Sequence, residues 1–405
     1  MLRNTEAVPA QLAVAVGVDE EADARSAVRR ALGVAYAALP QDPGLVILFC
    51  TSAYPLPVLL GAARVFTGPT PLIGGTSGSG LMSGAGVVGM GGKGTAVAAM
   101  AIAGGGVAAG VGHADLDADP RAAGESAARA AMTSVTGQSD RPRAAIIVSP
   151  PGHEETLLQG VAAVVGRGVP LFGCTVADEQ VAGRWAVFAG NHVLPNAVAV
   201  AVLYGEFLAG TAFSGGYWPT ARAARAEKAS GRMLEVMEGR PAASVYAGWL
   251  GVASEALRGQ GVRSYAAASP LAVEDARTSR LLIKEPGTVA ADGSVGFFAD
   301  LNQGDCLRLL TSTPESLVAA AGAATSEAMM RAGLRGDQVR GVLVAQGAGR
   351  VLALRERANE VPLQLRRLIG GAPMLGCATF GEQSALADGR PVHLNLTASV
   401  LVLGG

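Results

Sequence analysis

The sequence predicts an α/β protein in which repeated β-α-β-α-β-β units form mixed sheets covered by helices, arranged in two domains. Three observations predict this fold class. A Gly-centred motif occurs three times, apolar strand-like runs alternate with longer helix-like segments before each copy, and 50% of the 405 residues are hydrophobic. This content supplies enough apolar surface for more than one buried core.

The repeated motif consists of Pro, two large apolar residues, Gly, and then a loop of small and hydroxyl-bearing residues. Its three copies cover residues 71–80, 170–179 and 373–382. Internal repetition of this kind constrains the architecture before any other feature is considered. Each copy follows an apolar strand, and ligand crevices in α/β sheets form where loops leave the carboxyl ends of strands. We therefore expect the three loops to converge around one solvent-reachable hollow.

Short runs rich in Val, Ile and Leu predict buried strands, and Ala- and Arg-rich segments of helical period predict helices. The first unit is expected to have strands at 11–17, 45–50 and 94–103 and helices at 19–39 and 58–66. The second is expected to have strands at 106–111, 144–148 and 196–204 and helices at 120–133 and 154–167. The third is expected to have strands at 305–310, 341–345 and 397–403 and helices at 314–332 and 350–369.

A segment unrelated to the repeats, 208–304, separates the second and third units. It predicts a helix over 242–257 with Pro241 near its first turn, and strands near 281–284 and 294–299. We therefore expect one domain over residues 10–215, holding two units. A second domain over 216–405 would hold the inserted segment and the third unit.

Charge and hydropathy exclude several classes of partner. The chain has 32 basic and 33 acidic residues and a net charge of −1, so no basic face for nucleic acid is expected. Residues 1–6 lack the pattern of a signal peptide. The most apolar stretch, 96–111, is interrupted by glycines and is shorter than the roughly 20 residues of a membrane span. We expect a cytoplasmic protein without a membrane partner.

Neither a metal nor a cofactor is expected. The four cysteines and four histidines are scattered, without the close ligand pairs of a zinc site, and the cysteines are expected to be buried thiols. Residues 84–89 match the dinucleotide-binding pattern as a string, but a Gly-rich, strand-like segment follows them instead of a helix.

Aligning the motif copies on their shared glycine indicates which loop residues could contact a ligand. The second position holds Gly75, Cys174 and Cys377, the third Thr76, Thr175 and Ala378, and the seventh Gly80, Glu179 and Glu382. Small residues allow a ligand to approach backbone N–H groups. A carboxylate at the seventh position could accept from an ammonium or hydroxyl group. Alternatively, it caps a turn or pairs with a nearby arginine.

Arg350 follows a predicted strand and the sequence Gly347-Ala348-Gly349, a position that suits a carboxylate or phosphate group. The alternative is a salt bridge from Arg350 to Glu382 or Glu356.

His393, Asn395 and Thr397 alternate along the strand expected after the third motif, so their side chains should point to one face. Polar side chains in that position need partners if they are buried, and the partner could be the motif loop or a ligand.

Taken together, these motifs resemble the FIST family of sensory proteins. The matching pieces include the three Gly-rich loops, Gly216-Tyr217-Trp218-Pro219, Gly349-Arg350 and Asn395-Leu396-Thr397. The resemblance implies a sensory protein that binds a small polar metabolite, such as an amino acid, and signals through a separate partner protein. The chain departs from the family pattern at Gly80 and Gln346, which favours the C-terminal loop as the binding site.

We therefore predict a non-enzymatic ligand-binding protein. The predicted ligand-binding residues are Arg350, Gly376, Cys377, Thr379, Gly381, Glu382, Asn395, Thr76, Ser77, Cys174, Thr175 and Glu179. The alternatives are a protein-interaction scaffold, or an enzyme that uses Cys377 or Glu382.

Overall fold

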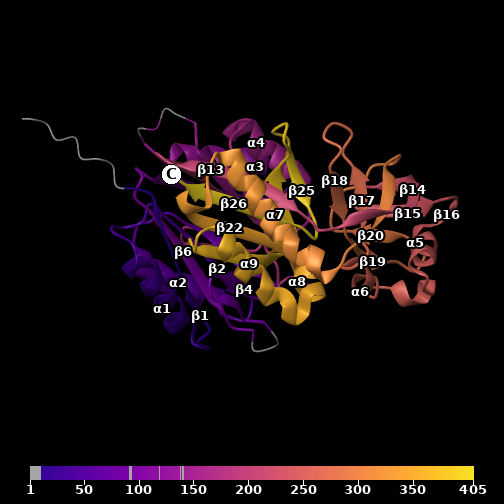
Figure 1. Cartoon of the computed structure of the whole chain (residues 1–405), viewed down its shortest axis with the longest axis horizontal. Coiled ribbons are helices and arrows are strands. Elements are labelled where there is room, and N and C mark those ends of the chain that lie inside the picture. The colour runs from indigo at the N-terminus through magenta and orange to yellow at the C-terminus, as the bar shows by residue number, and fades with distance from the viewer. Residues whose placement is uncertain (1–10, 91–93, 118, 137, 139–140) are drawn as a thin grey trace, which may run out of the picture.

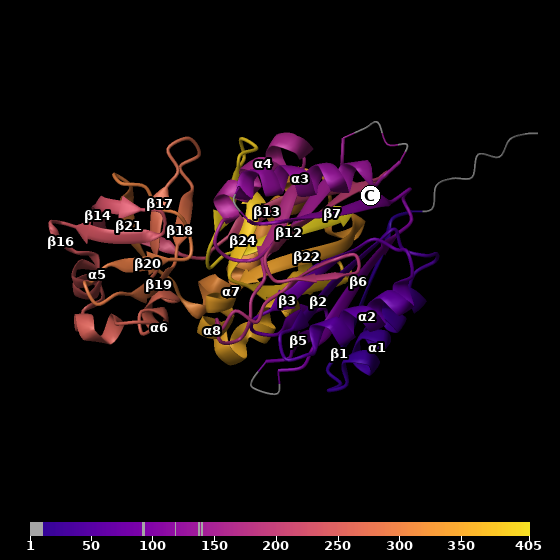
Figure 2. The same ribbon diagram turned by 180° about the vertical axis from the view of Figure 1, so that it is seen from behind.

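The chain forms a body of three α/β units, and a smaller β-rich domain is inserted into the third unit (Figures 1 and 2). This computed structural model describes residues 11–90, 94–117, 119–136, 138 and 141–405. Mixed sheets covered by helices make up the body, so the predicted fold class is confirmed. The prediction that residues 1–6 carry no signal peptide falls outside the described residues.

The first unit contains, in chain order, β1 (Ala13–Asp19), α1 (Ala24–Ala37), β2 (Leu45–Thr51), α2 (Leu56–Thr67), β3 (Leu72–Ser77), β4 (Leu81–Ser83), β5 (Gly86–Val88) and β6 (Val97–Ala103). Strand β2 is buried throughout because both faces of its sheet are covered. Along it, Ile47 and Phe49 face the centre of the body, and Val46 and Leu48 face helices α1 and α2.

The second unit repeats this order with β7 (Ala108–Asp115), α3 (Pro120–Thr133), β8 (Ala144–Ser149), α4 (Glu154–Val165), β9 (Leu171–Thr175), β10 (Val187–Ala189), β11 (His192–Leu194) and β12 (Ala197–Tyr204). The third consists of β13 (Leu208–Ser214), α7 (Pro314–Ala332), the 3₁₀ turn η2 (Gly336–Gln338), β22 (Val339–Gly347), α8 (Ala348–Leu354), the 3₁₀ turn η3 (Arg355–Asn359), α9 (Glu360–Leu368), β23 (Met374–Thr379), β24 (Gly381–Ala385), β25 (Pro391–Leu394) and β26 (Ala398–Gly404).

The first helix of each unit begins after a residue whose side chain caps it. Asp23, Asp119 and Thr313 accept hydrogen bonds from backbone N–H groups of the first turns of α1, α3 and α7. Such caps supply partners for N–H groups that lack them inside the helix. The repetition of the units thus extends to the local chemistry that starts their helices.

Each unit donates its short hairpin to the sheet of another unit. Hairpin β4–β5 of the first unit pairs with β23 of the third, β10–β11 of the second pairs with β3 of the first, and β24–β25 of the third pairs with β9 of the second. The three resulting sheets have the orders β1-β6-β2-β3-β10-β11, β25-β24-β9-β8-β12-β7 and β13-β26-β22-β23-β4-β5. The exchange is cyclic, so each sheet contains strands of two units.

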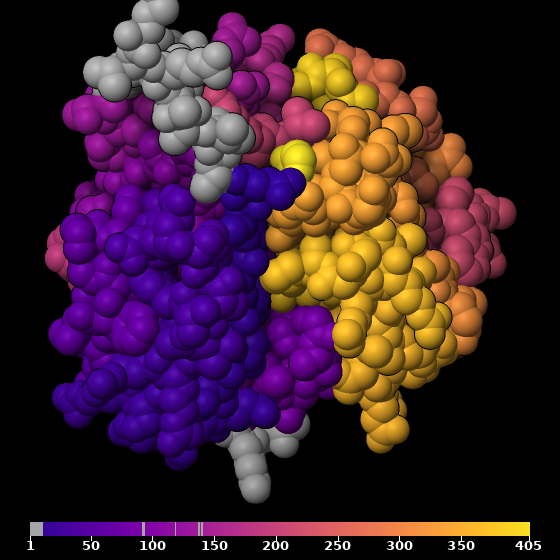
Figure 3. Space-filling model, turned by 60° about the vertical axis from the view of Figure 1, so that its left-hand side comes forward, coloured from indigo at the N-terminus to yellow at the C-terminus, as the bar shows by residue number. Residues whose placement is uncertain are grey.

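The inner faces of the three sheets pack against one another. A single buried cluster includes Ile47 of β2, Ile146 of β8 and Leu343 of β22, which are 0 to 1% exposed. Figure 3 shows the consequence on the surface, where the N-terminal unit (indigo) lies along the C-terminal unit (yellow). Within the described residues, no helix combines the length and the apolar character that crossing a bilayer requires.

The inserted domain contains β14 (Trp218–Ser230), β15 (Met233–Met237), β16 (Arg240–Pro241), α5 (Ala242–Leu250), the 3₁₀ turn η1 (Ser254–Leu257), α6 (Arg263–Ala266), β17 (Leu271–Glu274), β18 (Leu281–Lys284), β19 (Pro286–Val289), β20 (Val295–Phe297) and β21 (Cys306–Thr311). It has its own sheet and its own apolar core around Tyr246.

Four sequence-based predictions of local structure are wrong. The helix predicted over 242–257 ends at Leu250, because Gly251 adopts a φ of 71°, and only the 3₁₀ turn η1 follows it. Segment 305–310 is not the first strand of the third unit, because β21 pairs with β14 and β17 inside the small domain and β13 takes that place beside β26. The single helix predicted over 350–369 is divided into α8, η3 and α9, with Arg355 at a φ of 50°. Cys306 is exposed, whereas the other cysteines are buried.

Candidate ligand site

The loops that follow β3, β9 and β23 meet in a ring of backbone hydrogen bonds. In each bond, the N–H group at the fifth position of one motif copy donates to the carbonyl at the third position of another. The bonds join Gly78 N to Ala378 O (3.0 Å), Ala177 N to Thr76 O (3.1 Å) and Phe380 N to Thr175 O (3.2 Å). The three loops therefore converge, and these amides bind one another instead of being free for a ligand.

Polar side chains of the first loop are also paired inside the protein. Thr76 Oγ1 accepts from Ala186 N at 3.1 Å. Ser77 Oγ donates to Gly80 O at 2.6 Å and accepts from Ala378 N at 2.8 Å. Both side chains are buried, so they join the loop to its neighbours.

The third loop is held in the same way. Glu382 is 0% exposed, and its carboxylate accepts from Thr379 Oγ1 at 2.8 Å and from Thr397 N and Oγ1 at 2.8 and 2.7 Å. Burial raises the pKa of Glu382 to about 7, although these bonds oppose the shift. Asn395 Oδ1 accepts from the N–H group of Glu285, a residue of the small domain, at 3.2 Å.

The second loop contributes two buried residues. Thr175 Oγ1 donates to Glu154 Oε1 at 3.1 Å, and Cys174 lies beside Cys377 at the junction of the loops. A hydrogen bond with Cys174 and burial raise the pKa of Cys377, so this thiol is protonated at neutral pH. A protonated thiol is a poor nucleophile.

Two motif glycines are required by close packing. A side chain at Gly376 would clash with Met82, and one at Gly381 would clash with the ring of His393. Gly376 and Cys377 line a small cavity of about 20 Å³. That volume holds about one water molecule.

Arg350 is fully buried at the start of α8. Its Nη2 group donates to Leu317 O, and its Nε and Nη1 groups have no hydrogen-bond partner among the described residues. Neither Glu382 nor Glu356 forms the ion pair considered from the sequence. Burial lowers the pKa of Arg350, and the charges of Tyr217 and Glu382 oppose this.

A cavity of about 720 Å³ lies between the loop ring and the small domain. The body contributes a residue from each motif loop to its lining, namely Ser79, Glu179 and Thr379. The small domain contributes Arg263 of α6, Glu285 after β18 and Phe298 after β20. Of the residues predicted from the sequence to bind ligand, Glu179 and Thr379 line this cavity. Whether the remaining predicted residues contact a ligand stays a prediction.

An arginine and a carboxyl group of the small domain, Arg263 and Glu285, are among the titratable side chains that line this cavity. Arg263 donates from Nε to Gly287 O at 3.0 Å, and no ion pair within 4.0 Å joins it to Glu285 among the described residues. Burial raises the pKa of Glu285 to about 8, with a further increase from Glu382 and an opposing effect of Arg263. Glu285 Oε1 lies so close to Gly349 that a methyl group there would be 2.9 Å away.

Aromatic rings form another part of the cavity lining. Phe298 of the small domain stacks on Phe380 of the third loop, with ring centroids 6.4 Å apart and an angle of 15° between the planes. The guanidinium group of Arg263 lies 5.4 Å from the centroid of Phe298. The small domain and the body thus meet through an aromatic pair beside the charged groups.

Sequence reasoning missed Arg263, Glu285 and Phe298. All three lie in the inserted segment, which has no internal repeat, and none of them belongs to its motif Gly216-Tyr217-Trp218-Pro219. The one available indication was Glu285 itself, a carboxylate directly after the apolar run Leu281–Ile283 and Lys284.

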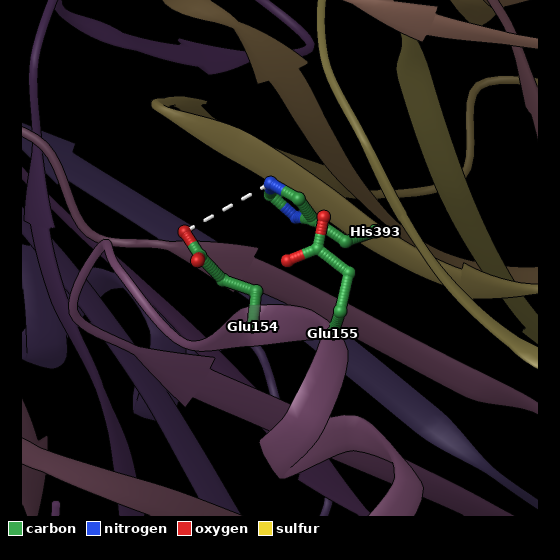
Figure 4. A group of neighbouring side chains, drawn as sticks. All are labelled: Glu154, Glu155 and His393. Carbon is green, nitrogen blue, oxygen red and sulfur yellow. Dashed lines mark ion pairs between the residues drawn. The ribbon is translucent and has the colours of Figure 1, made fainter. Parts of the chain in front are cut away.

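A second group of ligand-type side chains, Glu154, Glu155 and His393, lies on the body where it faces the small domain, with their ligand atoms within 4.8 Å of one another (Figure 4). Two cations already neutralise it. Arg232 Nη2 lies 2.5 Å from Glu154 Oε2 and 2.9 Å from Glu155 Oε2, and Lys284 Nζ lies 4.0 Å from Glu155 Oε1. These contacts favour a salt-bridge network over a metal site.

We name this network, together with Asp300, the interdomain ion cluster. It consists of Glu154, Glu155, His393, Arg232, Lys284 and Asp300.

Convergent loops beside a cavity between two domains are typical of small-molecule-binding proteins. This chain belongs to the FIST family: the FIST N domain matches residues 44–240 and the FIST C domain matches residues 242–385. Domains of this family are sensory domains that bind small ligands.

Among solved structures, cyanuric acid hydrolase from A. caulinodans is similar over 97% of this chain and 99% of its own, with a TM-score of 0.37 and 10% identity. T. maritima PurL complexed with FGAR is similar over 98% of this chain and 73% of its own, with a TM-score of 0.24 and 10% identity. At these TM-scores neither likeness carries an argument about function. No curated protein matches the sequence.

Proposed function

We propose that this protein is a non-enzymatic sensor that binds a small zwitterionic metabolite, such as an amino acid, in the cavity between the body and the small domain. One observation carries the proposal: Arg263 and Glu285 line the same cavity without pairing with each other. A guanidinium group and a carboxyl group that do not pair with each other suit a ligand that has both a carboxylate and an ammonium group, and a bound ammonium group would favour the ionised form of Glu285.

In this proposal, Arg263 binds the ligand carboxylate and Glu285 binds the ammonium group. The stacked rings of Phe298 and Phe380 contact the apolar part of the ligand. The cavity of about 720 Å³ is within the range common for small-molecule sites, roughly 300 to 1,000 Å³. Such a sensor would act in the cytoplasm and pass its signal to a separate partner protein.

The test is a thermal-shift screen of the purified protein against the common α-amino acids and related polar metabolites. A ligand at 100 times its Kd should stabilise the protein by about 2.7 kcal/mol, because it binds only the folded state. Native mass spectrometry of the freshly purified protein would detect a ligand that is retained through purification.

Substitutions of cavity-lining residues test whether the ligand binds in this cavity. Arg263→Ala should abolish the ligand-induced shift, because the carboxylate loses its partner, and Arg258→Ala is the matched control. Arg258 is an exposed arginine of the same domain that does not line the cavity. A shift of equal size in the wild type and in Arg263→Ala would contradict the proposed site. Absence of any stabilising metabolite would contradict the sensor function.

A further inference from the structure

Two segments of the small domain contribute both to the cavity and to the interdomain ion cluster. In the first, the side chain of Lys284 joins the cluster and that of Glu285 lines the cavity. Successive side chains along an extended chain point in opposite directions, which explains this division. In the second, the ring of Phe298 lines the cavity and Asp300 Oδ1 lies 3.2 Å from Arg232 Nε in the cluster.

The backbone of the same two segments is bonded to the body. The N–H group of Glu285 donates to Asn395, and the N–H group of Asp300 donates to Glu155 Oε1 at 2.9 Å. The carbonyl of Phe298 lies 3.1 Å from His393 Nε2. If the side chains of Glu285 and Phe298 move, the backbone groups of the same segments, which are hydrogen-bonded to the body, must therefore move as well.

The small domain is attached to the body by two chain crossings, at 215–217 and at 312–313. At the first, Gly216 has a φ of 78°, a conformation that favours glycine. Two crossings near one edge of an inserted domain permit a hinge motion, in which a few residues absorb the change in backbone angles.

We propose that the interdomain ion cluster holds the small domain closed over the ligand cavity, and that segments 284–285 and 298–300 couple cavity occupancy to this closure. The inference rests on the proposed function only for the identity of the ligand. Coupling between two sites is reciprocal. A ligand that contacts Glu285 and Phe298 stabilises the closed cluster, and a weakened cluster lowers the affinity for the ligand.

Closure is measured without any ligand by the distance between two spin labels. The exposed Cys306 labels the small domain, and Gln159→Cys labels an exposed position of α4 on the body. Cys50, Cys174 and Cys377 are buried and should not react. The protein with otherwise native sequence should give one narrow distance distribution.

Arg232→Met should add a second distance population, because it removes the cation that joins Glu154 and Glu155 to the small domain. If this variant does not fold, Lys284→Met removes the other cation of the cluster and should give the same change. A distribution identical to that of the parent protein would overturn the proposal.

The matched control is Asp275→Asn. Asp275 forms an ion pair with Arg390 of the body at 2.8 Å, so this variant also breaks an ion pair between the domains. Asp275 and Arg390 lie outside both coupling segments and do not line the cavity. The control should keep the narrow distribution. If Asp275→Asn opens the domain as much as Arg232→Met does, the special role of the interdomain ion cluster is overturned.

A mixture of the common α-amino acids then tests the coupling. The amino-acid mixture should narrow the distribution of label distances in Arg232→Met. The concentration that does so should be at least about fivefold higher than the concentration that stabilises the parent protein. Equal concentrations for both proteins would overturn the coupling. If the mixture does not stabilise even the parent protein, the proposed ligand class fails, and the label distances still decide whether the cluster controls closure.

Discussion

Glu382 lies fully buried in the third motif loop with three hydrogen bonds from Thr379 and Thr397. Burial nevertheless raises its pKa from 4.5 to about 7. A carboxyl group whose pKa is raised on folding stabilises the folded state fully below the unfolded pKa. This contribution is lost as the pH rises through the folded pKa.

We therefore expect the free energy of unfolding to fall between pH 4.5 and pH 7, by about 3 kcal/mol from Glu382 alone. Urea denaturation across this range measures the slope. Glu382→Gln should flatten it, and Glu285, whose pKa is raised to about 8, should leave a residual slope of the same sign. An unchanged slope in Glu382→Gln would show that this carboxyl group titrates normally in the folded protein.

Arg350 gives a second test at the scale of the residue. Its guanidinium group is buried, and Nε and Nη1 have no partner among the described residues. Replacing a buried charge by an apolar side chain of similar volume is often neutral or stabilising, by about 1 to 4 kcal/mol. We expect Arg350→Met to unfold at the same temperature as the wild type or higher.

The control for Arg350→Met is Arg366→Met, an exposed position that should change stability by no more than about 0.5 kcal/mol. A large loss of stability in Arg350→Met alone would contradict this expectation and would prompt a search for an anion retained beside Arg350. Mass spectrometry of the same samples would then identify it.

The sequence identified the motif loops as the polar meeting point, and it did so from residue types alone. The residue types could not indicate which of these polar side chains are hydrogen-bonded inside the protein and which remain available to a ligand. The bonds from Thr397 to Glu382 agree with one of the two alternatives expected for Thr397, a partner in the motif loop. Ala186, which donates to Thr76, is far from its partner along the chain and comes close only on folding. Arg263 and Glu285 belong to no sequence motif, so the sequence does not indicate that these two side chains line one cavity.

At the scale of the element, the helix pairs of the first two units differ in how closely they pack. Helices α3 and α4 meet at Gly124 and Gly160, where an added methyl group would clash with the backbone carbonyls of Leu157 and Arg121. In α2 of the first unit, no atom of the described part of the chain that could be displaced lies within 4 Å of a methyl group added at Gly61. Glycine is therefore required by helix packing at Gly160, whereas a larger residue fits at Gly61.

We expect Gly160→Ala to destabilise the protein by about 1 to 3 kcal/mol, because α3 and α4 must move apart. Gly61→Ala should stabilise it by about 0.5 to 1 kcal/mol, because alanine loses less backbone entropy in a helix. Thermal unfolding of both variants measures the two effects. Effects of the same sign would contradict the packing described for one of the helix pairs.

Most long strands and helices of the repeats follow from hydrophobic pattern and length, as β2 and α3 show. The exchanged hairpins do not, because strands such as Leu81–Ser83 and Val187–Ala189 have only three residues and no periodicity to recognise. Segment 305–310 has the right composition for the first strand of a repeat. Its true partners, β14 and β17, decide its place, and pairing of that kind is not encoded locally.

For the whole molecule, cyclic hairpin exchange makes each unit depend on the others. The sheet around β8 and β9 is completed by β24 and β25 of the third unit, and β23 is completed by β4 and β5 of the first. The inner faces of all three sheets also bury one common apolar cluster. Removing a unit exposes both a strand edge and this cluster, which favours aggregation.

We therefore expect neither fragment 11–205 nor the α/β unit of fragment 206–405 to fold alone, although the cut falls between β12 and β13, outside every strand. Both fragments should bind a hydrophobic dye. Fragment 11–205 should lack a cooperative unfolding transition, and any transition of fragment 206–405 should come from its small domain, which has its own core. Fragments expressed together should associate one to one, because the two hairpins and the central cluster are restored, and the complex should unfold in a single transition. Size-exclusion chromatography with light scattering measures the association. A monomeric, cooperatively unfolding fragment 11–205 would show that the first two units form an independent domain despite the missing strands.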